Sequence, residues 1–466
     1  MNAPMSEETL SRISKLFVDQ DGEYPDSSLR RRSEHCIQLC VGDDVAESQV
    51  LQLAVLTAAN LASRCFPGAL TVQMSEELRK TACLVSWPKS PSFGDAVSSV
   101  ADSHIANLAQ GSDISTVVFG NAISSARALR VTFDGWRASV GPVANTPRLA
   151  ERPYCSLAGV AAGALAVGEI FYAFAHLSVE ATRRQVGLSL WRPDLPISDE
   201  ATLGEPVIEL PAAVGVFGLG HLGQAYLWAL ASLPYTAPSE LIVTLCDDDI
   251  VKKANVETGA VFTYNDIGFL KTRVNSAWLE SRGFKTRLIE RRVDENFRRT
   301  EEEPVIALSG FDDNRARRWL AKGKFSRVFD SGLGGNAENF DTISFHSFPN
   351  VRSPEELWPV ETPGELAAAT AKRQRWLASN PAYQSMSPDE CGRLLLANKS
   401  VAVPFVGAMA SCLVVSELLK MICGGPRFDD LKVRLNALRG SVSHAVASQY
   451  HVAELSGVKL ISSRTA

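Results

Sequence analysis

The segment Val214–Asn255 restricts the possible folds of this chain more than any other stretch. An apolar run leads into a glycine-rich turn, an Ala- and Leu-rich helical pattern follows, and a second apolar run ends in acidic residues. The residues that define the pattern are Gly218, Gly220 and Gly223 in the turn, and Asp247, Asp248 and Asp249 after the second run. The order strand, glycine-rich turn, helix and strand is typical of a β-α-β unit that holds a nucleotide.

Each part of this unit has a chemical purpose. Glycine allows a tight turn and a close approach of the backbone to a phosphate, and the free N–H groups at the start of a helix attract its negative charge. An acidic residue at the end of the second strand accepts hydrogen bonds from two ribose hydroxyls. The unit therefore predicts an adenosine-containing ligand, and it leaves open whether that ligand is NAD or ATP.

Composition narrows the class of protein. The chain has 466 residues, of which 45% are hydrophobic, and this suffices for two to four domains with large cores. The formal net charge is -5 and there is no block of basic residues, so no nucleic-acid or anionic-membrane partner is expected. The N-terminus lacks the pattern of a signal peptide and no stretch is apolar enough to cross a bilayer. We therefore expect a cytoplasmic protein.

The cysteines argue against a zinc site. There are nine of them and no CxxC pair, so a four-thiolate zinc site is not expected. Most lie in apolar runs, where a buried free thiol is the ordinary interpretation. Cys391 differs, because it lies in the polar segment SPDECGRLL.

The chain contains a second copy of the same order of elements. From Cys36, a short apolar strand and a helical run over 47–63 repeat the pattern, and a further strand is expected over 82–87. The turn of this copy reads VGDDVAES, with Asp43 and Asp44 where phosphate-binding glycines would be needed. We therefore predict that this copy binds no nucleotide.

Each copy closes with a similar helix, rich in small residues. The segments 154–174 and 404–422 share helical spacing and carry one glutamate inside an apolar run, Glu169 in the first and Glu417 in the second. The second copy is about seventy residues longer than the first, which is a large insertion compared with the usual length of a domain. We predict an inactive adenylation-like domain over 1–180, a linker over 181–210, an active domain over 211–426 with an insertion over 335–400, and a short C-terminal β-element over 427–466.

Two residues beyond the nucleotide-binding unit are candidates for contact with phosphate. Lys271 lies on a helical segment, where a lysine ordinarily faces solvent, but its place behind the unit favours a phosphate contact. Asp312 follows the buried strand expected over 304–310, at the sheet edge where ligands bind, and there it could hold magnesium on a triphosphate. The alternative is that Asp312 or Asp313 caps the helix that begins at Asn314.

The combination of motifs resembles the E1 superfamily, which comprises ubiquitin-activating enzymes and the bacterial adenylyltransferases of thiamine and molybdopterin synthesis. The motifs are GLGHLG, DDDIVKKAN, DIGFLK, FDDNRARR, a late cysteine and a helix ending SELLK, and the match covers residues 200–425. Residues 30–175 are similar only to the degenerate partner domain of E1 enzymes. The two-domain layout and the ECG…VAVPFVGA stretch look most like the bacterial E1-like proteins of phage-defence conjugation operons.

This resemblance implies a fold and a set of site residues. The implied fold is α/β, with two Rossmann-like adenylation domains in one chain that form an intramolecular pseudo-dimer with a degenerate N-terminal member. Carried over position by position, the residues expected to bind ATP are Gly218, Gly220, Gly223, Asp247, Asp249, Asn255 and Lys271, with Asp312 on magnesium and Arg317 nearby. The partner domain is expected to lend one arginine from the cluster Arg30, Arg31 and Arg32, and the sequence leaves open which one.

Two departures from the family pattern affect this prediction. The family has an Arg-Gln pair where this chain has Thr258 and Gly259, so one phosphate contact is absent or is supplied elsewhere. The zinc cysteines that are typical of the sulphur-carrier branch are missing. Their absence favours ubiquitin-type activation over sulphur transfer.

The implied reaction has two steps. The C-terminal carboxylate of a ubiquitin-like protein attacks the α-phosphate of MgATP, with Lys271, Arg317 and magnesium neutralising charge. A thiolate then displaces AMP, and the resulting thioester is passed to an E2-like protein. Cys391 is the candidate nucleophile because it stands before a predicted helix whose N-terminus lowers a thiol pKa, although Asp389 and Glu390 oppose this effect. The alternative is a structural cysteine.

The segment 353–383 contains helical pieces and breakers, and it is expected to be a lid over the cysteine or the surface that receives the carrier protein. Three other interpretations remain at this stage. They are a sulphur-carrier adenylyltransferase without thioester transfer, an NAD-dependent Rossmann oxidoreductase, and a non-catalytic scaffold with two degenerate halves. MgATP binding together with a protein-bound thioester would separate the E1-type enzyme from all three.

Overall fold

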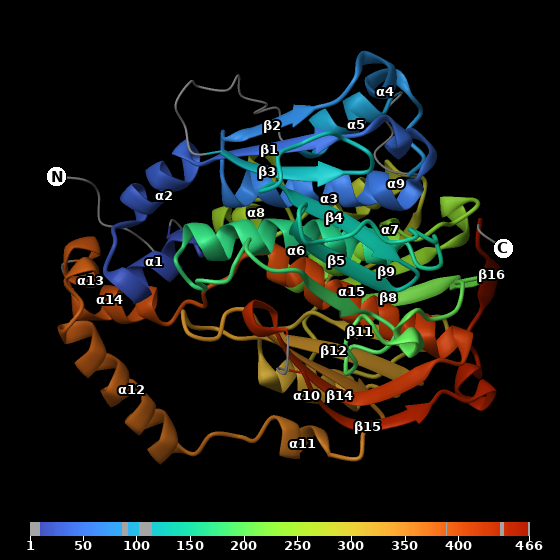
Figure 1. Ribbon diagram of the computed structural model, residues 1–466. Helices are drawn as coiled ribbons and strands as arrows, with labels where there is room; N and C mark the ends of the chain where they lie inside the picture. The colour runs from blue at the N-terminus through green and yellow to red at the C-terminus, as the bar shows by residue number, and fades with distance from the viewer. Residues whose placement is uncertain (1–9, 86–91, 102–113, 388, 439–441, 465–466) are drawn as a thin grey trace.

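The computed structural model describes residues 10–85, 92–101, 114–387, 389–438 and 442–464. Two α/β halves lie one above the other, with two long helices between their sheets (Figure 1). The N-terminal half is drawn in blue to green, and the C-terminal half in green to red. Residues 86 and 87 of the strand expected over 82–87 lie outside the described ranges.

The N-terminal half contains a six-stranded sheet of order β2-β1-β3-β4-β5-β6. The first four of these run parallel, and β5 and β6 continue the sheet antiparallel. The strands are β1 Cys36–Val41, β2 Leu70–Gln73, β3 Ile114–Phe119, β4 Leu129–Asp134, β5 Arg137–Pro142 and β6 Val186–Ser189. The apolar runs of the sequence thus form a largely buried sheet, as parallel strands require.

The C-terminal half contains an eight-stranded sheet of order β10-β9-β8-β11-β12-β13-β14-β15. The strands up to β12 are parallel, and the last three are antiparallel. They are β8 Ala213–Phe217, β9 Ile242–Cys246, β10 Lys285–Ile289, β11 Ile306–Ser309, β12 Arg327–Leu333, β13 Thr342–Phe348, β14 Pro426–Arg434 and β15 Ser443–Gln449. Without β10 and β15 at the edges, this is the strand order of the N-terminal sheet, so the repeat predicted from sequence is a repeat of topology.

The helices follow the same repeat. Helix α3 follows β1 as α7 follows β8, and α6 and α15 are the long helices that close the two halves. The helices of the N-terminal half are α1 Ser14–Asp21, α2 Pro25–Glu34, α3 Gln49–Cys65, α4 Glu76–Lys80, α5 Phe93–Val100 and α6 Leu157–Phe174. Those of the C-terminal half are α7 His221–Ala231, α8 Lys253–Thr258, α9 Lys271–Glu280, α10 Asn314–Ala321, α11 Pro354–Leu357, α12 Pro363–Ala378, α13 Pro381–Met386, α14 Glu390–Ala397 and α15 Pro404–Cys423.

Helices α6 and α15 join the two halves into one core. They pack on each other between the sheets, and each also packs on the first long helix of its own half. Small residues allow the close approach, since a Cβ atom on Gly168 would lie 3.2 Å from the Phe405 ring. Contrary to the expectation that no stretch is apolar enough to cross a bilayer, both helices are long and apolar enough by length and composition alone, but their apolar windows are 89% and 100% buried inside the protein. Their apolar character therefore serves the core.

The two matched glutamates do the same structural work in the two halves. Glu169 accepts a hydrogen bond from the Thr182 N–H at 2.8 Å, and Glu417 accepts one from the Phe428 N–H at 2.9 Å. Each carboxylate thus ties its helix to the segment that returns into the sheet. Glu417 is also paired with Lys420 at 2.5 Å, and both side chains are almost completely buried.

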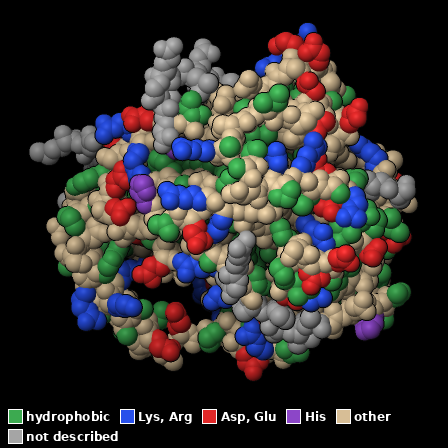
Figure 2. Space-filling view, viewed as in Figure 1, with side chains coloured by type: hydrophobic (Ala, Val, Ile, Leu, Met, Phe, Trp, Pro, Cys, Tyr) green, Lys and Arg blue, Asp and Glu red, His purple; other side chains and the backbone are tan. Residues whose placement is uncertain are grey.

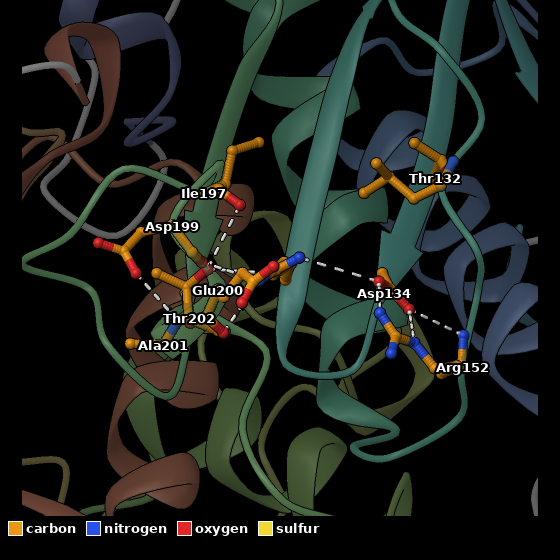
Figure 3. A network of polar contacts seen from close by, with 11 residues as sticks. Thr132, Asp134, Arg152, Ile197, Asp199, Glu200, Ala201 and Thr202 are labelled. Carbon is orange, nitrogen blue, oxygen red and sulfur yellow. Dashed lines mark hydrogen bonds and ion pairs between the residues drawn. The ribbon is translucent and has the colours of Figure 1, made fainter.

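The predicted linker over 181–210 is partly built into the N-terminal half. Its first part forms β6, and its later part is held by the Arg137 side chain, which donates to the Thr202 hydroxyl and the Asp199 carbonyl, each at 2.8 Å (Figure 3). Asp134, at the end of the neighbouring strand, holds Arg152 through three hydrogen bonds, one from its backbone N–H and two from its side chain. The linker therefore crosses to the C-terminal half from a fixed position.

Two smaller predictions differ from the structure. The described part of the strand expected over 82–87 forms no strand; instead, the Gln52 side chain accepts the Leu84 N–H and donates to the Ala82 carbonyl. The C-terminal β-element expected over 427–466 is no separate unit, because β14 and β15 extend the large sheet. Only β16 Leu460–Ser462 leaves it, to pair with β7 Glu209–Pro211.

The insertion of the C-terminal half forms an arm, which we define as residues 354–397, helices α11 to α14. Figure 1 shows it leaving the lower part of the molecule and returning at the left, beside α1. All residues of 361–376 are exposed, and Leu377 is the buried residue of α12. Helix α12 therefore bridges from one end of the arm to the other, and it packs on the body only through its last turn, at Leu377.

The far end of the arm rests on α1, which belongs to the N-terminal half. Leu10 and Val18 form a small apolar cluster with residues of α12 to α14, namely Leu377, Ala382, Tyr383, Met386, Leu396 and Ala397. Leu16 and Phe17, on the other side of α1, belong to the main core. Helix α1 thus lies between two cores. Within the contact, Lys15 donates to Tyr383 Oη at 2.8 Å, and Tyr383 donates to Asp19 at 2.6 Å.

Candidate functional site

The glycine-rich turn between β8 and α7 packs tightly on one side and is open on the other. Gly218 has φ +80°, and a Cβ atom there would lie 2.9 Å from the Gly310 carbonyl carbon. A Cβ atom on Gly223 would lie 2.1 Å from the Gly218 oxygen. Gly220 has nothing within 4 Å of that position. Gly218 and Gly223 are therefore needed for the turn itself, whereas Gly220 borders open space.

The start of α7 offers its N–H groups to that space. Gly220 is the N-cap residue, and no side chain caps the helix. The first N–H groups of an uncapped helix carry partial positive charge and bind anions well. His221 is the first residue of α7; burial lowers the pKa of its imidazole to about 4, so the ring is neutral near pH 7. This end of α7 is a suitable place for a phosphate.

The acidic residues after β9 meet the turn and Lys271. Asp247 accepts the Leu219 N–H at 2.6 Å, which fixes the turn to β9. Lys271 lies 2.8 Å from an Asp249 oxygen and 3.7 Å from an Asp247 oxygen. Lys271 is buried, which excludes the solvent-facing alternative, and it begins α9. The structure therefore brings the predicted ribose acid and the predicted phosphate lysine together.

The two carboxylates differ in their electrostatics. Burial raises the pKa of Asp247, against the opposing effect of Lys271. Burial acts in the same direction on Asp249, but the hydrogen bond and the charge of Lys271 outweigh it, so its pKa is lowered. Asp247, Asp248 and Asp249 are close enough to surround a metal ion, but the Lys271 ammonium group already supplies a positive charge there. The group is thus better suited to hydroxyl groups than to a second cation.

Asn255 and the two unusual positions after it have local roles. The Asn255 side-chain oxygen accepts the Lys252 N–H at 2.9 Å and so caps α8. Thr258 is buried and donates to the Ala254 carbonyl. A Cβ atom on Gly259 would lie 2.0 Å from the Gln224 amide. Neither Thr258 nor Gly259 therefore supplies the cation that the family pattern has at this point.

Sequence reasoning missed the residues that hold this segment in place. Gln224 accepts the Val261 and Phe262 N–H groups and donates to the carbonyls of Gly220 and Asn255. Its one signal is a glutamine within an apolar helical pattern. From the N-terminal half, Arg64 donates to the carbonyls of Val256 and Phe262, and Asn60 donates to that of Ala260. No local pattern indicates these contacts, because they join distant parts of the chain.

The loop after β11 carries Asp312, the predicted magnesium ligand, and Asp313; either one could cap α10 by the sequence alone. Asp313 caps α10, since its carboxylate accepts the Arg315 N–H at 2.7 Å. Asp312 is exposed and, within the described part of the chain, its carboxylate makes no hydrogen bond. Both follow the strand that lies beside β8. Asp312 therefore fits a magnesium ligand at the open edge, and Asp313 has a structural role.

Arg317 points back under this loop. Its Nε donates to the Phe311 carbonyl at 2.7 Å, and a terminal nitrogen donates to the Ser331 carbonyl at 3.3 Å. The nearest carboxylate is Asp330, 3.7 Å from Nε. In this conformation Arg317 fixes the loop that carries Asp312 rather than extending into open space.

The arginine cluster divides between different environments. Arg32 is buried, which lowers its pKa, and it donates to the Cys65 carbonyl. Arg31 pairs with Glu23 at 2.8 Å and stacks on the rings of Phe17 and Phe174. Arg30 is exposed, and its side chain makes no hydrogen bond within the described residues. Arg31 and Arg32 are thus committed to the N-terminal half, which leaves Arg30 as the candidate for an arginine lent to the site.

The corresponding turn of the N-terminal half is filled by its own side chains. Asp44 accepts the Asn121 N–H at 2.9 Å and pairs with Arg148 at 2.6 Å. A Cβ atom on Gly120 would lie 2.1 Å from the Asp44 carboxylate. Helix α3 begins with a true cap, since Ser48 accepts the Leu51 N–H. A carboxylate and a serine thus occupy the positions that a phosphate would need.

Cys391 lies in the first turn of α14, at the far end of the arm. Of the nine cysteines it is the exposed one. The Asp389 carboxylate caps α14 by accepting the Gly392 N–H at 2.6 Å, so a negative charge stands at the helix end that was expected to lower the thiol pKa. Leu396 and Ala397, on the same helix, are buried against α1, which turns Cys391 outward. The fold therefore presents the thiol to solvent.

A cavity of about 680 Å³ lies elsewhere, between the linker and the C-terminal end of α15. Its lining includes Trp191, Glu205, Cys423 and Gln449. None of the residues predicted from sequence lines it. The chemistry-bearing residues instead gather at the open edge around Gly220, which the packing of the turn defines.

Comparisons with known proteins agree with this division into two halves. Residues 36–190 match the family described as BilD N-terminal domain, and residues 210–425 match BilD C-terminal domain. The chain is 32% identical over 436 residues to the bacterial E1-like protein BilD of Collimonas sp. (strain OK412), covering 92% of each protein. Among solved structures, E. coli MccB with succinimide is 13% identical with a TM-score of 0.35, covering 52% of this chain and 64% of MccB, less than two thirds of that protein. E. coli tRNA N6-threonylcarbamoyladenosine dehydratase, TcdA, is 17% identical with a TM-score of 0.29, covering 46% of this chain and 86% of TcdA.

Proposed function

This chain belongs to the BilD family of bacterial E1-like proteins, and we propose that it activates the C-terminus of a ubiquitin-like protein in two steps. In the first, it adenylates the carboxylate with MgATP. In the second, it takes the acyl group onto Cys391 as a thioester, for transfer to an E2-like protein. We further propose, from the family resemblance, that this conjugation serves antiviral defence in the bacterial cytoplasm.

The observation that carries the adenylation step is the uncapped start of α7. Its N–H groups and the space beside Gly220 face the same edge as Asp249 and Lys271. ATP matches this arrangement, with phosphates at the helix start and ribose hydroxyls at the acidic residues. Asp312 would hold magnesium, which neutralises phosphate charge when bound.

The first of the two steps needs no nucleophile from the enzyme. A carboxylate oxygen of the carrier protein forms a bond to the α-phosphorus, and the bond to pyrophosphate breaks. Lys271 leaves Asp249 to stabilise the developing charge, because the ribose replaces it as the partner of that carboxylate. The Cys391 thiolate, its proton lost to solvent, then attacks the acyl carbon, and AMP leaves.

The arm supplies the surface for the carrier protein in this proposal. Figure 2 shows a hollow at the lower left, between the arm and the body, with Lys and Arg side chains at its edges. Helix α12 carries exposed basic residues, Lys372, Arg373 and Arg375. An extended C-terminal tail with a free carboxylate fits such a passage by charge. The sequence-based alternative of a lid over Cys391 stays a prediction, since α12 lies beside α14, where Gln374 donates to Glu390 at 3.0 Å, and Cys391 itself is exposed.

The N-terminal half is, in this proposal, a partner that binds no nucleotide and completes an intramolecular pseudo-dimer. Asp44 and Ser48 fill its turn, and Arg64 and Asn60 support the active half. The N-terminal half thus supports the segment around Gln224 and supplies the positive charge of Arg30.

The deciding experiment is intact-mass analysis of Cys391→Ser purified from its native host, beside wild-type protein kept without reductant. An ester on serine is transferred less readily than a thioester, so we expect the variant to retain its carrier protein as a covalent adduct on residue 391. Cys423→Ser is a matched control and should carry none. MgATP-dependent pyrophosphate exchange without any adduct would favour an adenylyltransferase that forms no thioester. NAD binding, or no nucleotide binding, would contradict the proposal as a whole.

A further inference from the structure

Asp330 is a buried carboxylate without a hydrogen-bond partner. It lies on β12, with a relative exposure of 1%, and neither of its oxygens accepts a hydrogen bond from the described residues. Taking a charge out of water is costly unless it is paired and hydrogen-bonded. A strand residue of this kind is therefore retained for a reason other than stability.

Among the described residues, one cationic side chain is available to Asp330 as a partner. His346 is directly opposite on β13, but its ring binds Asp430 at 2.6 Å, and Asp430 also pairs with Arg352 at 2.8 Å. Arg317 of α10 is the remaining neighbour, with Nε 3.7 Å from an Asp330 oxygen. At that distance the two charges attract without forming a hydrogen bond.

Arg317 in turn controls the loop that carries Asp312. Its guanidinium group spans from the Phe311 carbonyl to the Ser331 carbonyl, so it ties the loop after β11 to β12. Gly332 makes room for it, because a Cβ atom there would lie 2.6 Å from a terminal nitrogen of Arg317. A small rotation of this guanidinium group would move the Phe311 carbonyl and, one residue on, Asp312.

We propose that Asp330 is a positioning residue for magnesium binding: it orients Arg317, and Arg317 holds the loop that presents Asp312. The inference rests on the proposed adenylation function and names a residue that no motif indicated. It explains why a strand beside the site carries an unsatisfied carboxylate. The effect passes through Arg317, so Asp330 itself touches neither nucleotide nor metal.

The test is Asp330→Asn in the full-length protein, which keeps the shape and removes the charge. Asp341→Asn is the matched control, because Asp341 is an equally buried carboxylate at the start of the adjacent strand and lies beside Arg434 instead. We expect MgATP-dependent pyrophosphate exchange in Asp330→Asn to need about tenfold more Mg²⁺, as for the loss of other groups that orient metal ligands, and excess MgCl₂ to restore it. In an Arg317→Met background, Asp330→Asn should have no further effect.

A second readout does not depend on activity. Without ligand, Asp330→Asn should unfold close to the wild-type temperature, because the Asp330 carboxylate accepts no hydrogen bond from the described residues and Arg317 keeps its hydrogen bonds to the Phe311 and Ser331 carbonyls. With MgATP at a fixed concentration, the rise in unfolding temperature should be smaller than for wild type by about 2 °C. A structural role would instead lower the unfolding temperature and leave the Mg²⁺ requirement unchanged.

The outcomes separate the two proposals. Wild-type protein without pyrophosphate exchange contradicts the proposed function, and the role of Asp330 falls with it. Exchange in wild type with an unchanged Mg²⁺ requirement in Asp330→Asn overturns the role of Asp330 alone. An equal shift in Asp341→Asn, or an additive effect with Arg317→Met, overturns it as well.

Discussion

The two halves of this protein share a strand order, and the start of the first helix shows how they differ in their capacity to hold an anion. In the N-terminal half, Ser48 caps α3 and Asp44 fills the turn. In the C-terminal half, α7 has no side-chain cap and Gly220 borders open space. The same fold can thus stabilise a helix start with its own side chains or leave it for an anion. The difference lies in a few residues of one turn, and four predictions test it.

The largest effect is expected where the halves are most alike, at the glutamates of α6 and α15. Glu417→Ala should lower the free energy of unfolding by about 3–5 kcal/mol, because it leaves the Lys420 ammonium group buried without its partner. Glu169→Ala should cost about 1–3 kcal/mol, since Arg184 is partly exposed and also pairs with Glu180. Urea unfolding of both variants measures the difference. Equal losses would show that the repeat is energetically symmetric.

Cations beside the two turns should differ in function. Lys271→Met should lower MgATP-dependent pyrophosphate exchange by about 100-fold, the usual effect of removing a group that stabilises transition-state charge. Arg148→Met, which removes the cation beside Asp44, should leave the exchange rate unchanged. Circular dichroism checks that both variants are folded. A comparable loss in Arg148→Met would mean that the N-terminal turn also acts on nucleotide.

Exchanging the caps tests the comparison directly. Gly220→Ser should fold normally, because its Cβ atom enters open space, but the hydroxyl would compete with phosphate for the N–H groups of α7. We expect about tenfold weaker MgATP binding by calorimetry, the loss of about one charge-assisted hydrogen bond. Ser48→Gly should cost a few tenths of a kcal/mol and create no nucleotide binding, because Asp44 remains. ATP binding at α3 in that variant would contradict this account.

The smallest effect concerns His221, whose counterpart at the start of α3 is Gln49. Burial lowers the pKa of His221 to about 4 in the folded protein, below the value of about 6.5 for an unfolded chain. The unfolded state therefore binds more protons between these values, and stability falls as the pH decreases through this range. His221→Gln should remove about 0.7 kcal/mol of that loss between pH 7 and pH 6, measured by urea unfolding. An unchanged pH dependence would show that the imidazole has the same pKa in the folded and the unfolded protein.

Much of this architecture could be predicted from sequence, because the signals are local. The E1-like resemblance is confirmed by the family matches, and the glycine turn is where the sequence placed it. The matched glutamates have matching contacts. Apolar periodicity and turn glycines act within a few residues, so they survive in a single sequence.

The parts that could not be predicted depend on distant pairs. Nothing near Asp330 in sequence indicates that His346 is committed to Asp430, which leaves Arg317 as its neighbour. Likewise, the family has an Arg-Gln pair where this chain has Thr258 and Gly259, and the sequence left open whether the missing contact is supplied elsewhere. In the structure Gly259 packs against Gln224, and Arg64 supports the segment. The roles of Cys391, Asp312 and Arg30 remain predictions, which the exposure of all three favours.

The position of α1 between two cores has a consequence for biosynthesis. The contact between Lys15 and Tyr383 joins residues 368 positions apart. At ordinary translation speeds the ribosome needs roughly 20–70 s to supply the second partner after the first. During that time the N-terminal half can complete its own sheet. One face of α1 stays exposed to solvent until the arm has been synthesised. The thiol-bearing end of the arm is therefore synthesised after the half that seats it can fold, and before α15 and β14 complete the C-terminal half.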